Sequence, residues 1–380
     1  MATLRAVDIP AGPEVLTLLP AVERLLAERH DAMLPVPGSD PREKSLLTTA
    51  LRVGEPIDDD VALVVSTSGT TGTPKGAMLT AAALTASATA THARLGGAGR
   101  WLLALPAHHI AGLQVLIRSV LAGTTPVVLD GFAALPAAVE ALGGGRRYAS
   151  LVAAQLAKAL TDPAATAALA EFDAVLIGGG PMPGVVAERA TAAGISVVRT
   201  YGMSETAGGC VYDGVPLDGV RVRVDGSRVV LGGATLAKGY RNPPPEGQDP
   251  FCEPGWFQTD DAGSIDANGV LTVHGRLDDG ISTGGVTILP HVVEAVILAH
   301  PAVAQCAVFG VTDERLGQRV VAAVVATGEL SLQQLRAHVA ATLDATAAPR
   351  ELHLVDELPV RGIGKVDRRA LAERFSHPPD

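Results

Sequence analysis

VALVVSTSGTTGTPKG, residues 61–76, joins a run of branched apolar residues to a loop of small polar ones. The run at 61–65 predicts a buried β-strand, because a short continuous apolar stretch of this kind is typical of a strand covered on both faces. The loop after it offers glycine-freed backbone N–H groups, hydroxyl donors and one ammonium group, which together suit a polyphosphate. The residues expected to contact the phosphates are Thr67, Ser68, Gly69, Thr70, Thr71, Gly72 and Lys75.

The spacing of this loop excludes the Walker A type of phosphate loop. That type requires glycine, four residues and then Gly-Lys-Ser/Thr, whereas here Pro74 precedes Lys75 and Gly76 follows it. The alternative interpretation is a flexible surface loop, since Ser, Thr and Gly are also typical of linkers. A linker directly after a buried strand is uncommon, so the sequence favours phosphate binding.

The composition indicates a soluble cytoplasmic protein that binds small molecules. The chain has 380 residues and a formal net charge of −10, which disfavours nucleic acid and anionic membranes as partners. Its three cysteines lie far apart and predict neither a disulfide framework nor a zinc site. The N-terminal segment lacks a signal-peptide pattern, and no apolar stretch reaches the roughly 20 residues that span a bilayer. We therefore predict no membrane insertion.

Alternating strand and helix patterns predict an α/β fold with two domains. Up to about residue 275, short β-branched runs alternate with helical stretches such as 110–121, which predicts mostly parallel sheets with covering helices. Short strands and turns around 211–275 add a small antiparallel section. A helix over 332–343, with Ser331 and Gln334 spaced for a capping box, belongs to a second, small α+β domain. The expected domains are 1–277 and 278–380.

Two later strands end in segments that suit a nucleotide. The strand over 174–177 ends in Gly178-Gly179-Gly180, and the next strand ends in Tyr201-Gly202-Met203-Ser204-Glu205-Thr206. In a parallel sheet, ligands bind outside the carboxyl ends of the strands, so these segments predict a base and ribose pocket. Glu205 beside a polyphosphate is a candidate Mg²⁺ ligand, because Mg²⁺ prefers carboxylate and phosphate oxygens. The alternatives are an ordinary glycine turn and a solvated or helix-capping glutamate.

These segments occur in one order, and together they resemble the adenylate-forming superfamily of acyl-CoA and aryl-CoA synthetases, luciferases and peptide-synthetase adenylation domains. The matching pieces are the loop at 66–76, LPAHHIAGL (105–113), YGMSET (201–206), WFQTDDAG (256–263), GRLDDGISTGGVTILPHVVE (275–294) and LPVRGIGKVDRRAL (358–371). The resemblance implies that a carboxylate attacks the α-phosphate of ATP, with Mg²⁺ bound, to form an acyl-adenylate. The small C-terminal domain is then expected to rotate, and the thiol of coenzyme A attacks the adenylate.

The resemblance also implies roles for single residues. Lys365 matches the adenylation lysine, whose ammonium would offset charge repulsion between the carboxylate and the α-phosphate. Asp261 matches the ribose-binding aspartate, although Asp260 stands where the family usually has glycine and leaves the choice between the two open. Arg276 matches a nucleotide-contacting arginine and Asp278 the hinge of the mobile domain. The glycines expected at the coenzyme A channel are Gly284 and Gly285.

The chain departs from the family pattern at three further places. Ser282 replaces a lysine that many members have, and Val360-Arg361 replaces the common Arg-Thr. The phosphate loop begins only about 65 residues into the chain, so the N-terminal portion is shorter than in longer members. This shortening puts the usual N-terminal subdomain, and any dimer surface on it, in doubt. A homodimer is still a possible assembly.

Two residues of the 105–121 segment indicate the acid. His109, which follows His108, matches the family's gate at the acyl pocket, and the alternative is a structural histidine at a helix end. Arg118 stands among apolar residues with no acid in 107–129, so a carboxylate on the substrate would serve as its partner. A gate histidine followed nine positions later by an arginine resembles the arrangement in the o-succinylbenzoate–CoA ligases of menaquinone biosynthesis. Gly202 and Ser204 are expected at the same acyl pocket. The alternatives are a ligase for another aryl or fatty acid, and an adenylation module that loads a carrier protein.

Overall fold

The computed structural model describes residues 2–27, 31–67, 74–245, 247, 249–361 and 365–376. The chain forms two compact units, a larger one of Met1–Arg223 with Val230–Gln258 and a smaller one of Val224–Val229 with Thr259–Asp380. The expected boundary at 277/278 and the hinge at Asp278 stay predictions, because compactness does not locate a hinge. Among the residues described, no helix is long and apolar enough to cross a membrane.

A seven-stranded sheet forms the centre of the larger unit, in the order β13-β12-β11-β10-β9-β7-β8. The strands β11, β10, β9, β7 and β8 pair in parallel, whereas β12 is antiparallel to both of its neighbours. The bounds are β7 Arg100–Leu103, β8 Val127–Val128, β9 Arg147–Val152, β10 Ala174–Gly178, β11 Val197–Met203, β12 Gly208–Tyr212 and β13 Val215–Pro216.

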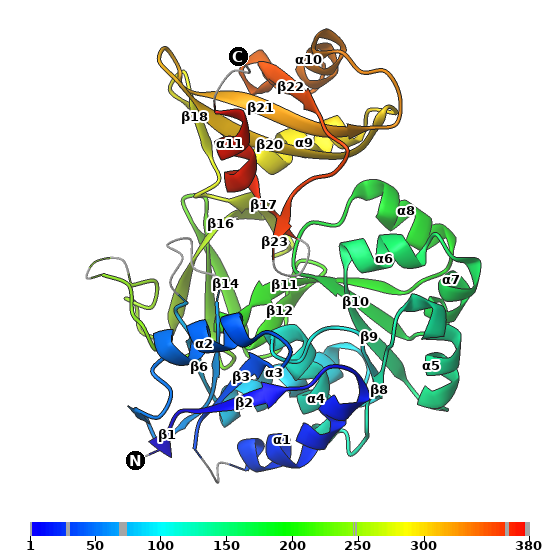
Figure 1. Ribbon diagram of the computed structural model, residues 1–380, viewed down its shortest axis with the longest axis vertical. Coiled ribbons are helices and arrows are strands. Elements are labelled where there is room, and N and C mark those ends of the chain that lie inside the picture. The colour runs from blue at the N-terminus through cyan, green and yellow to red at the C-terminus, as the bar shows by residue number, and fades with distance from the viewer. Residues whose placement is uncertain are drawn as a thin grey trace. The chain divides into compact units, whose positions relative to one another are not determined.

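Helices cover both faces of this sheet, as expected for parallel strands. Along β7, Trp101 and Leu103 belong to one apolar cluster and Leu102 to another, so the strand buries alternate side chains on opposite faces. The first cluster includes residues of α1 (Leu19–Leu26), α3 (Ala81–Arg94) and α4 (Ile110–Leu121). The second includes α5 (Leu135–Leu142), α6 (Ala153–Ala159), α7 (Pro163–Leu169) and α8 (Gly184–Ala192), which Figure 1 shows together in green.

A smaller sheet carries the strand that leads into the phosphate loop. Its order is β2-β3-β5-β6, with bounds Arg5–Ile9, Met33–Pro37, Val61–Val65 and Ala77–Thr80. All of β5 is buried, with no residue more than 4% exposed, which confirms the predicted buried strand. The short strands β1 (Ala2–Thr3) and β4 (Pro56–Ile57) pair nearby, and α2 (Pro41–Ala50) packs on β3.

The remaining strands are largely antiparallel. A four-stranded sheet has the order β14 (Val220–Asp225), β15 (Arg228–Gly233), β16 (Trp256–Ile265) and β17 (Leu271–Arg276). A five-stranded sheet in the smaller unit consists of β18 (Ile281–Thr283), β19 (Val286–Ile288), β20 (Val303–Asp313), β21 (Gly317–Ala326) and β22 (Glu351–Leu354). Its helices are α9 (Pro290–Leu298), α10 (Leu332–Ala340) and α11 (Arg368–Phe375), and Ser331 with Gln334 forms the expected capping box. The predicted α/β class, with a large N-terminal and a small C-terminal domain, is therefore confirmed.

Candidate active site

The described end of the phosphate loop is fixed by a later segment of the chain. Ser68, Gly69, Thr70, Thr71 and Gly72 lie outside the described residues, while Thr67 is half-buried just after β5. The backbone N–H of Arg241 donates to the Gly76 carbonyl at 2.8 Å, and that of Asn242 to the Lys75 carbonyl at 3.0 Å. The side-chain amide of Asn242 also donates to Pro74 at 3.1 Å. These hydrogen bonds hold the end of the loop in place just before β6 begins.

Glu205 lies in a short 3₁₀ turn, η3 (Ser204–Thr206), that directly follows β11. Its carboxylate is 7% exposed, and Oε1 accepts a hydrogen bond of 2.6 Å from the hydroxyl of Tyr240. The Lys75 ammonium lies 5.3 Å from the centroid of the same tyrosine ring. The tyrosine thus links the predicted metal ligand to the predicted phosphate lysine.

This donor set fits Mg²⁺ in the presence of a nucleotide. The described part of the chain contains no group of three or more His, Cys, Asp or Glu residues that could hold a metal ion by themselves. Mg²⁺ is commonly bound through one or two carboxylates, phosphate oxygens and water rather than by an all-protein cage. A single buried carboxylate near a phosphate lysine agrees with that pattern.

The two strand ends predicted to form a nucleotide pocket are brought together. Strands β10 and β11 are parallel neighbours, so Gly178, Gly179 and Gly180 lie at the same sheet edge as Tyr201 and its successors. A Cβ at Gly202 would lie 2.2 Å from the Gly208 carbonyl oxygen, so only glycine fits between β11 and β12.

Thr206 uses its hydroxyl within the turn, and its contact with the nucleotide stays a prediction. It is fully buried, its hydroxyl donates to the Gly208 carbonyl at 2.7 Å, and it accepts from the Met203 N–H at 3.0 Å. Ser204, by contrast, is half-buried at the start of the turn.

His109 is the N-cap residue of α4 and contacts His108, with ring centroids 4.2 Å apart and the ring planes tilted by 45°. Burial, together with the neighbouring His108, lowers the pKa of His109 to about 4. Burial also lowers the pKa of His108. Both rings are therefore neutral near pH 7, and His109 offers an uncharged, half-buried surface at the start of α4.

Arg118 is a buried cation on the third turn of α4. It is 3% exposed, and its guanidinium carbon lies 4.9 Å from the Trp101 ring centroid. Nη2 lies 3.5 Å from the Tyr212 hydroxyl, while Nε has no hydrogen-bond partner. No carboxylate of the described residues forms an ion pair with it, and burial lowers its pKa from the ordinary value, against the opposing effect of Tyr212. The local salt bridge that would make this arginine purely structural is not found in the described part of the chain.

Three other predicted residues lie together in the smaller unit, on β16, on β17 and just after β17. Asp261 and Arg276 are cross-strand partners, and Arg276 binds both carboxylate oxygens of Asp278 at 2.7 and 2.6 Å. Burial raises the pKa of Asp278, but its hydrogen bond to Arg276 and the charge of that arginine more than offset the effect, so the pKa lies below its ordinary value. Asp260 contacts Arg228 at 3.2 Å as well as Arg276 at 3.4 Å.

Gly284 and Gly285 form the two-residue turn between β18 and β19. Their φ angles are +59° and +83°, a combination that favours glycine at both positions of such a hairpin. The turn alone therefore explains the glycine pair, and a place at the coenzyme A channel stays a prediction. Lys365 begins β24 (Lys365–Val366), which pairs with β23 (Val360–Arg361).

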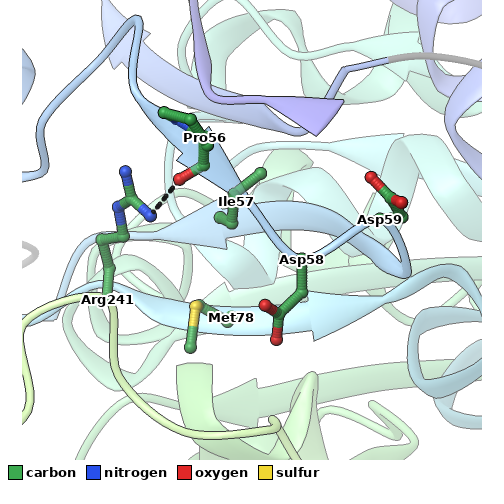
Figure 2. A pocket seen from close by; sticks show the side chains of 6 residues that line it. All are labelled: Pro56, Ile57, Asp58, Asp59, Met78 and Arg241. Atoms are coloured by element: carbon green, nitrogen blue, oxygen red, sulfur yellow. Dashed lines mark hydrogen bonds between the residues drawn. The ribbon is translucent and has the colours of Figure 1, made fainter. Parts of the chain in front are cut away.

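An open pocket of about 460 Å³ lies beside Arg241 (Figure 2). It is lined by Pro56, Ile57, Asp58, Asp59, Met78 and Arg241. At the edge of the pocket, the Arg241 guanidinium donates a hydrogen bond to the Pro56 carbonyl at 2.8 Å. No residue predicted to bind substrate lines this pocket, so it does not mark the candidate site.

Sequence reasoning missed Tyr240 and Gln114. Tyr240 contacts a glutamate 35 positions earlier, a pairing without local periodicity, although the tyrosine does follow Lys238-Gly239 on an irregular segment. Gln114 is a fully buried amide on α4 that donates to the Ala207 carbonyl at 2.8 Å. A polar residue on the apolar face of the predicted helix was the available signal for it.

The chain belongs to the AMP-binding enzyme family, whose model matches residues 11–236, and the model of the AMP-binding enzyme C-terminal domain matches 292–365. It is 66% identical to a probable 2-succinylbenzoate–CoA ligase from Mycobacterium tuberculosis over 384 residues, which covers 98% of this chain and 99% of the relative. A 2-succinylbenzoate–CoA ligase from Geobacillus sp. is 35% identical over 83% of this chain and 69% of its own.

Solved structures have the same fold. Escherichia coli MenE with a bound analogue of OSB-AMS is 28% identical, with a TM-score of 0.76 over 98% of this chain and 88% of its own. The o-succinylbenzoate CoA synthetase of Bacillus subtilis, in complex with the acyl-adenylate OSB-AMP, has a TM-score of 0.82 over 97% of this chain and 88% of its own. At 24% identity, this second likeness concerns the fold alone. The predicted adenylate-forming fold is thereby confirmed.

Proposed function

We propose that the protein is an AMP-forming acid–thiol ligase that converts 2-succinylbenzoate, ATP and coenzyme A to 2-succinylbenzoyl-CoA, AMP and pyrophosphate, a step of menaquinone biosynthesis. The observation that carries this proposal is the 66% identity to a probable 2-succinylbenzoate–CoA ligase over nearly the full length of both chains. The buried, unpaired cation on α4 independently supports an acid with a second carboxylate.

The nucleotide is proposed to lie at the edge where β10 and β11 end. The loop at 66–76 would hold the β- and γ-phosphates, with Lys75 as its point charge. Mg²⁺, when bound, supplies positive charge to the phosphate oxygens, and Glu205 would hold it with its carboxylate oriented by Tyr240. Asp261, which matches the family's ribose-binding position, would accept hydrogen bonds from both ribose hydroxyls, because a carboxylate is a double acceptor.

The reacting carboxylate and the α-phosphate are both anionic, so their approach requires a cation. Lys365 is proposed to supply it, by analogy with the family position that it matches, because an ammonium between two anions stabilises the charge of the transition state. In the second step the thiol of coenzyme A displaces AMP from the acyl-adenylate, with Gly284 and Gly285 proposed at its channel.

The acid is proposed to lie along α4. His109 and Arg118 are separated by nine residues, or about 13.5 Å of helix, and a helical side chain leans toward the N-terminus, so Arg118 reaches back toward His109. A carboxylate beside the unpaired Nε would complete the hydrogen bonding of a buried guanidinium. The neutral His109 would contact the uncharged part of the acid, and Gly202 and Ser204 would border the activated carboxyl.

Product analysis tests the proposal directly. The purified protein is incubated with ATP, Mg²⁺, coenzyme A and 2-succinylbenzoate, and mass spectrometry is expected to find the coenzyme A thioester and AMP in equal amounts. A panel of aryl and fatty acids, followed by pyrophosphate release, should show lower kcat/KM throughout. A better substrate in the panel, or an acyl-adenylate that coenzyme A does not consume, would overturn the proposed reaction.

Lys365→Ala separates the two half-reactions. We expect adenylation to slow by about 100-fold or more, because the variant loses a preorganised charge in the transition state. Thioester formation from synthetic acyl-adenylate should change little. The cytoplasmic location and the homodimer stay predictions, as does the mobility of the C-terminal domain.

A further inference from the structure

The turn that carries Glu205 ends in a strained residue. Ala207, which follows η3, has φ +53° and ψ 32°, the left-handed region that L side chains adopt only at a cost. It is fully buried, so solvent does not hold its backbone in place. Something in the surrounding structure therefore has to stabilise this conformation.

Two helices bind the carbonyl group of this residue. Ser87 of α3 donates its hydroxyl to the Ala207 carbonyl at 3.0 Å, and Gln114 of α4 donates its amide to the same oxygen at 2.8 Å. Both side chains are fully buried. The carbonyl thus has both of its lone pairs engaged, from two different elements.

One turn further along each helix, a second pair of side chains binds the far end of β12. Thr91 stands four residues after Ser87, and its hydroxyl lies 3.0 Å from the Tyr212 hydroxyl. Arg118 stands four residues after Gln114 and approaches the same hydroxyl at 3.5 Å. Residues four apart share a helix face, so α3 and α4 contact β12 at matching heights.

Gln114 is a poor choice for stability alone. Its Oε1 is buried and has no partner among the described residues, an arrangement that costs free energy. A leucine would fill a similar volume without an orphaned acceptor. Packing alone therefore does not explain the amide of Gln114. Its hydrogen bond to the Ala207 carbonyl does.

We propose that Gln114, assisted by Ser87, is a positioning residue that holds the turn at Ala207 and so fixes Glu205 and Thr206 at the nucleotide site. Ala207 is directly connected to the site residues. Its N–H donates to the Ser204 carbonyl at 3.1 Å, and the Thr206 hydroxyl hydrogen-bonds to Gly208 and Met203 within the same turn. On the other side, Ala237 N–H donates to the Glu205 carbonyl at 2.8 Å. This inference rests on the proposed use of ATP but not on the identity of the acid.

The test is Gln114→Leu, with Ser119→Ala as the matched control. Ser119 is also fully buried on α4, but its hydroxyl donates to Val115 within its own helix. Binding of ATP with Mg²⁺ is measured by titration calorimetry without any acid, together with the melting temperature. We expect Gln114→Leu to weaken ATP binding about tenfold with an unchanged or higher melting temperature, and Ser119→Ala to leave ATP affinity unchanged.

Rescue and replacement variants complete the test. Ala207→Gly in the Gln114→Leu background should recover part of the lost affinity, because glycine adopts the left-handed conformation without strain. If Gln114→Leu does not fold, Ser87→Ala removes the other donor and should weaken ATP binding in the same direction. ATP affinity within twofold of wild type in the folded variants would overturn the proposal, as would a melting temperature that falls in proportion to binding. Failure of wild type to convert 2-succinylbenzoate, with ATP binding intact, would overturn only the proposed acid.

Discussion

The two ends of helix α4 carry its two proposed substrate contacts, and they differ in charge and in burial. At the N-terminus His109 is half-buried, in contact with another histidine and neutral, with a pKa of about 4. Nine residues later Arg118 is 3% exposed, lies on Trp101 and has a guanidinium nitrogen without a partner. The difference indicates that electrostatic selection of the acid happens at the deep end, while the N-terminal end contributes shape.

Removal of the buried charge of Arg118 should have the largest effect on the use of 2-succinylbenzoate. In Arg118→Met we expect kcat/KM for 2-succinylbenzoate to fall about 100-fold, because a charge-assisted hydrogen bond in a buried site is worth about 1.5–3 kcal/mol. ATP affinity should stay unchanged, and the melting temperature should not fall, since an unpaired buried charge is lost. Steady-state kinetics with each substrate varied in turn gives the measurement.

Two controls separate a substrate clamp from a support for the sheet. Arg118→Lys keeps the charge but loses the fork of donors, so an intermediate loss is expected. For 3-benzoylpropionate, which lacks the ring carboxylate, wild type and Arg118→Met should be equally poor. If Arg118→Met impairs both acids alike, the arginine supports Tyr212 and the sheet, and the contrast between the ends of α4 disappears.

The neutral end should respond to shape instead of charge. We expect His109→Ala to lower kcat/KM about tenfold through lost packing against the acid, and His109→Phe to retain activity within a few-fold. Since the pKa of His109 is about 4, the pH dependence between 5 and 8 should be the same in wild type and in His109→Phe. A pH profile that changes over this range would show that the histidine exchanges a proton during the reaction.

The sequence predicted the helix that carries both contacts better than it predicted their surroundings. The bounds 110–121 agree with the structure, because an apolar run with a turn before it is a local signal. The contacts of Glu205 with Tyr240, and of Gln114 with Ala207, join residues 35 and 93 positions apart. Such pairings depend on how the sheets fold together, which no local pattern reports.

Thr206 illustrates the same limit at a single residue. A hydroxyl in a nucleotide motif suggests a contact with the ligand, yet its bonds to Met203 and Gly208 hold the turn together. The next residue, Ala207, has a left-handed backbone conformation that no local pattern predicts. Motif resemblance therefore predicts the site as a region, while the direction of each side chain requires coordinates.

Acid should destabilise the packing around α4, through His109 at its N-terminus and His92 of α3. Burial lowers the pKa of His92, next to Arg118, to about 4, as it does for His109. The unfolded value is near 6.5, so between these values the unfolded chain binds more protons. The stability contributed by the two neutral rings is fully present above pH 6.5 and is lost as the pH falls toward 4. Thermal unfolding at pH 7 and pH 5 should show this loss, and it should be smaller in His92→Gln, which can still accept from Trp101.

The smallest expected effect is a change in the pKa of His92 when Arg118 is replaced. It is also the most specific test of the difference between the two ends of α4. The pKa of His92 is lowered first by burial and then by the charge of Arg118, whereas that of His109 is lowered by burial and by His108. Arg118→Met should therefore raise the pKa of His92 without bringing it to 6.5, since the burial remains. The pKa of His109, nine residues away along the helix, should not change.

Both rings can be followed in one NMR titration, so each serves as the control of the other. Equal shifts at both histidines would mean that the substitution loosens the whole of α4, and the separate roles of its two ends would have to be abandoned.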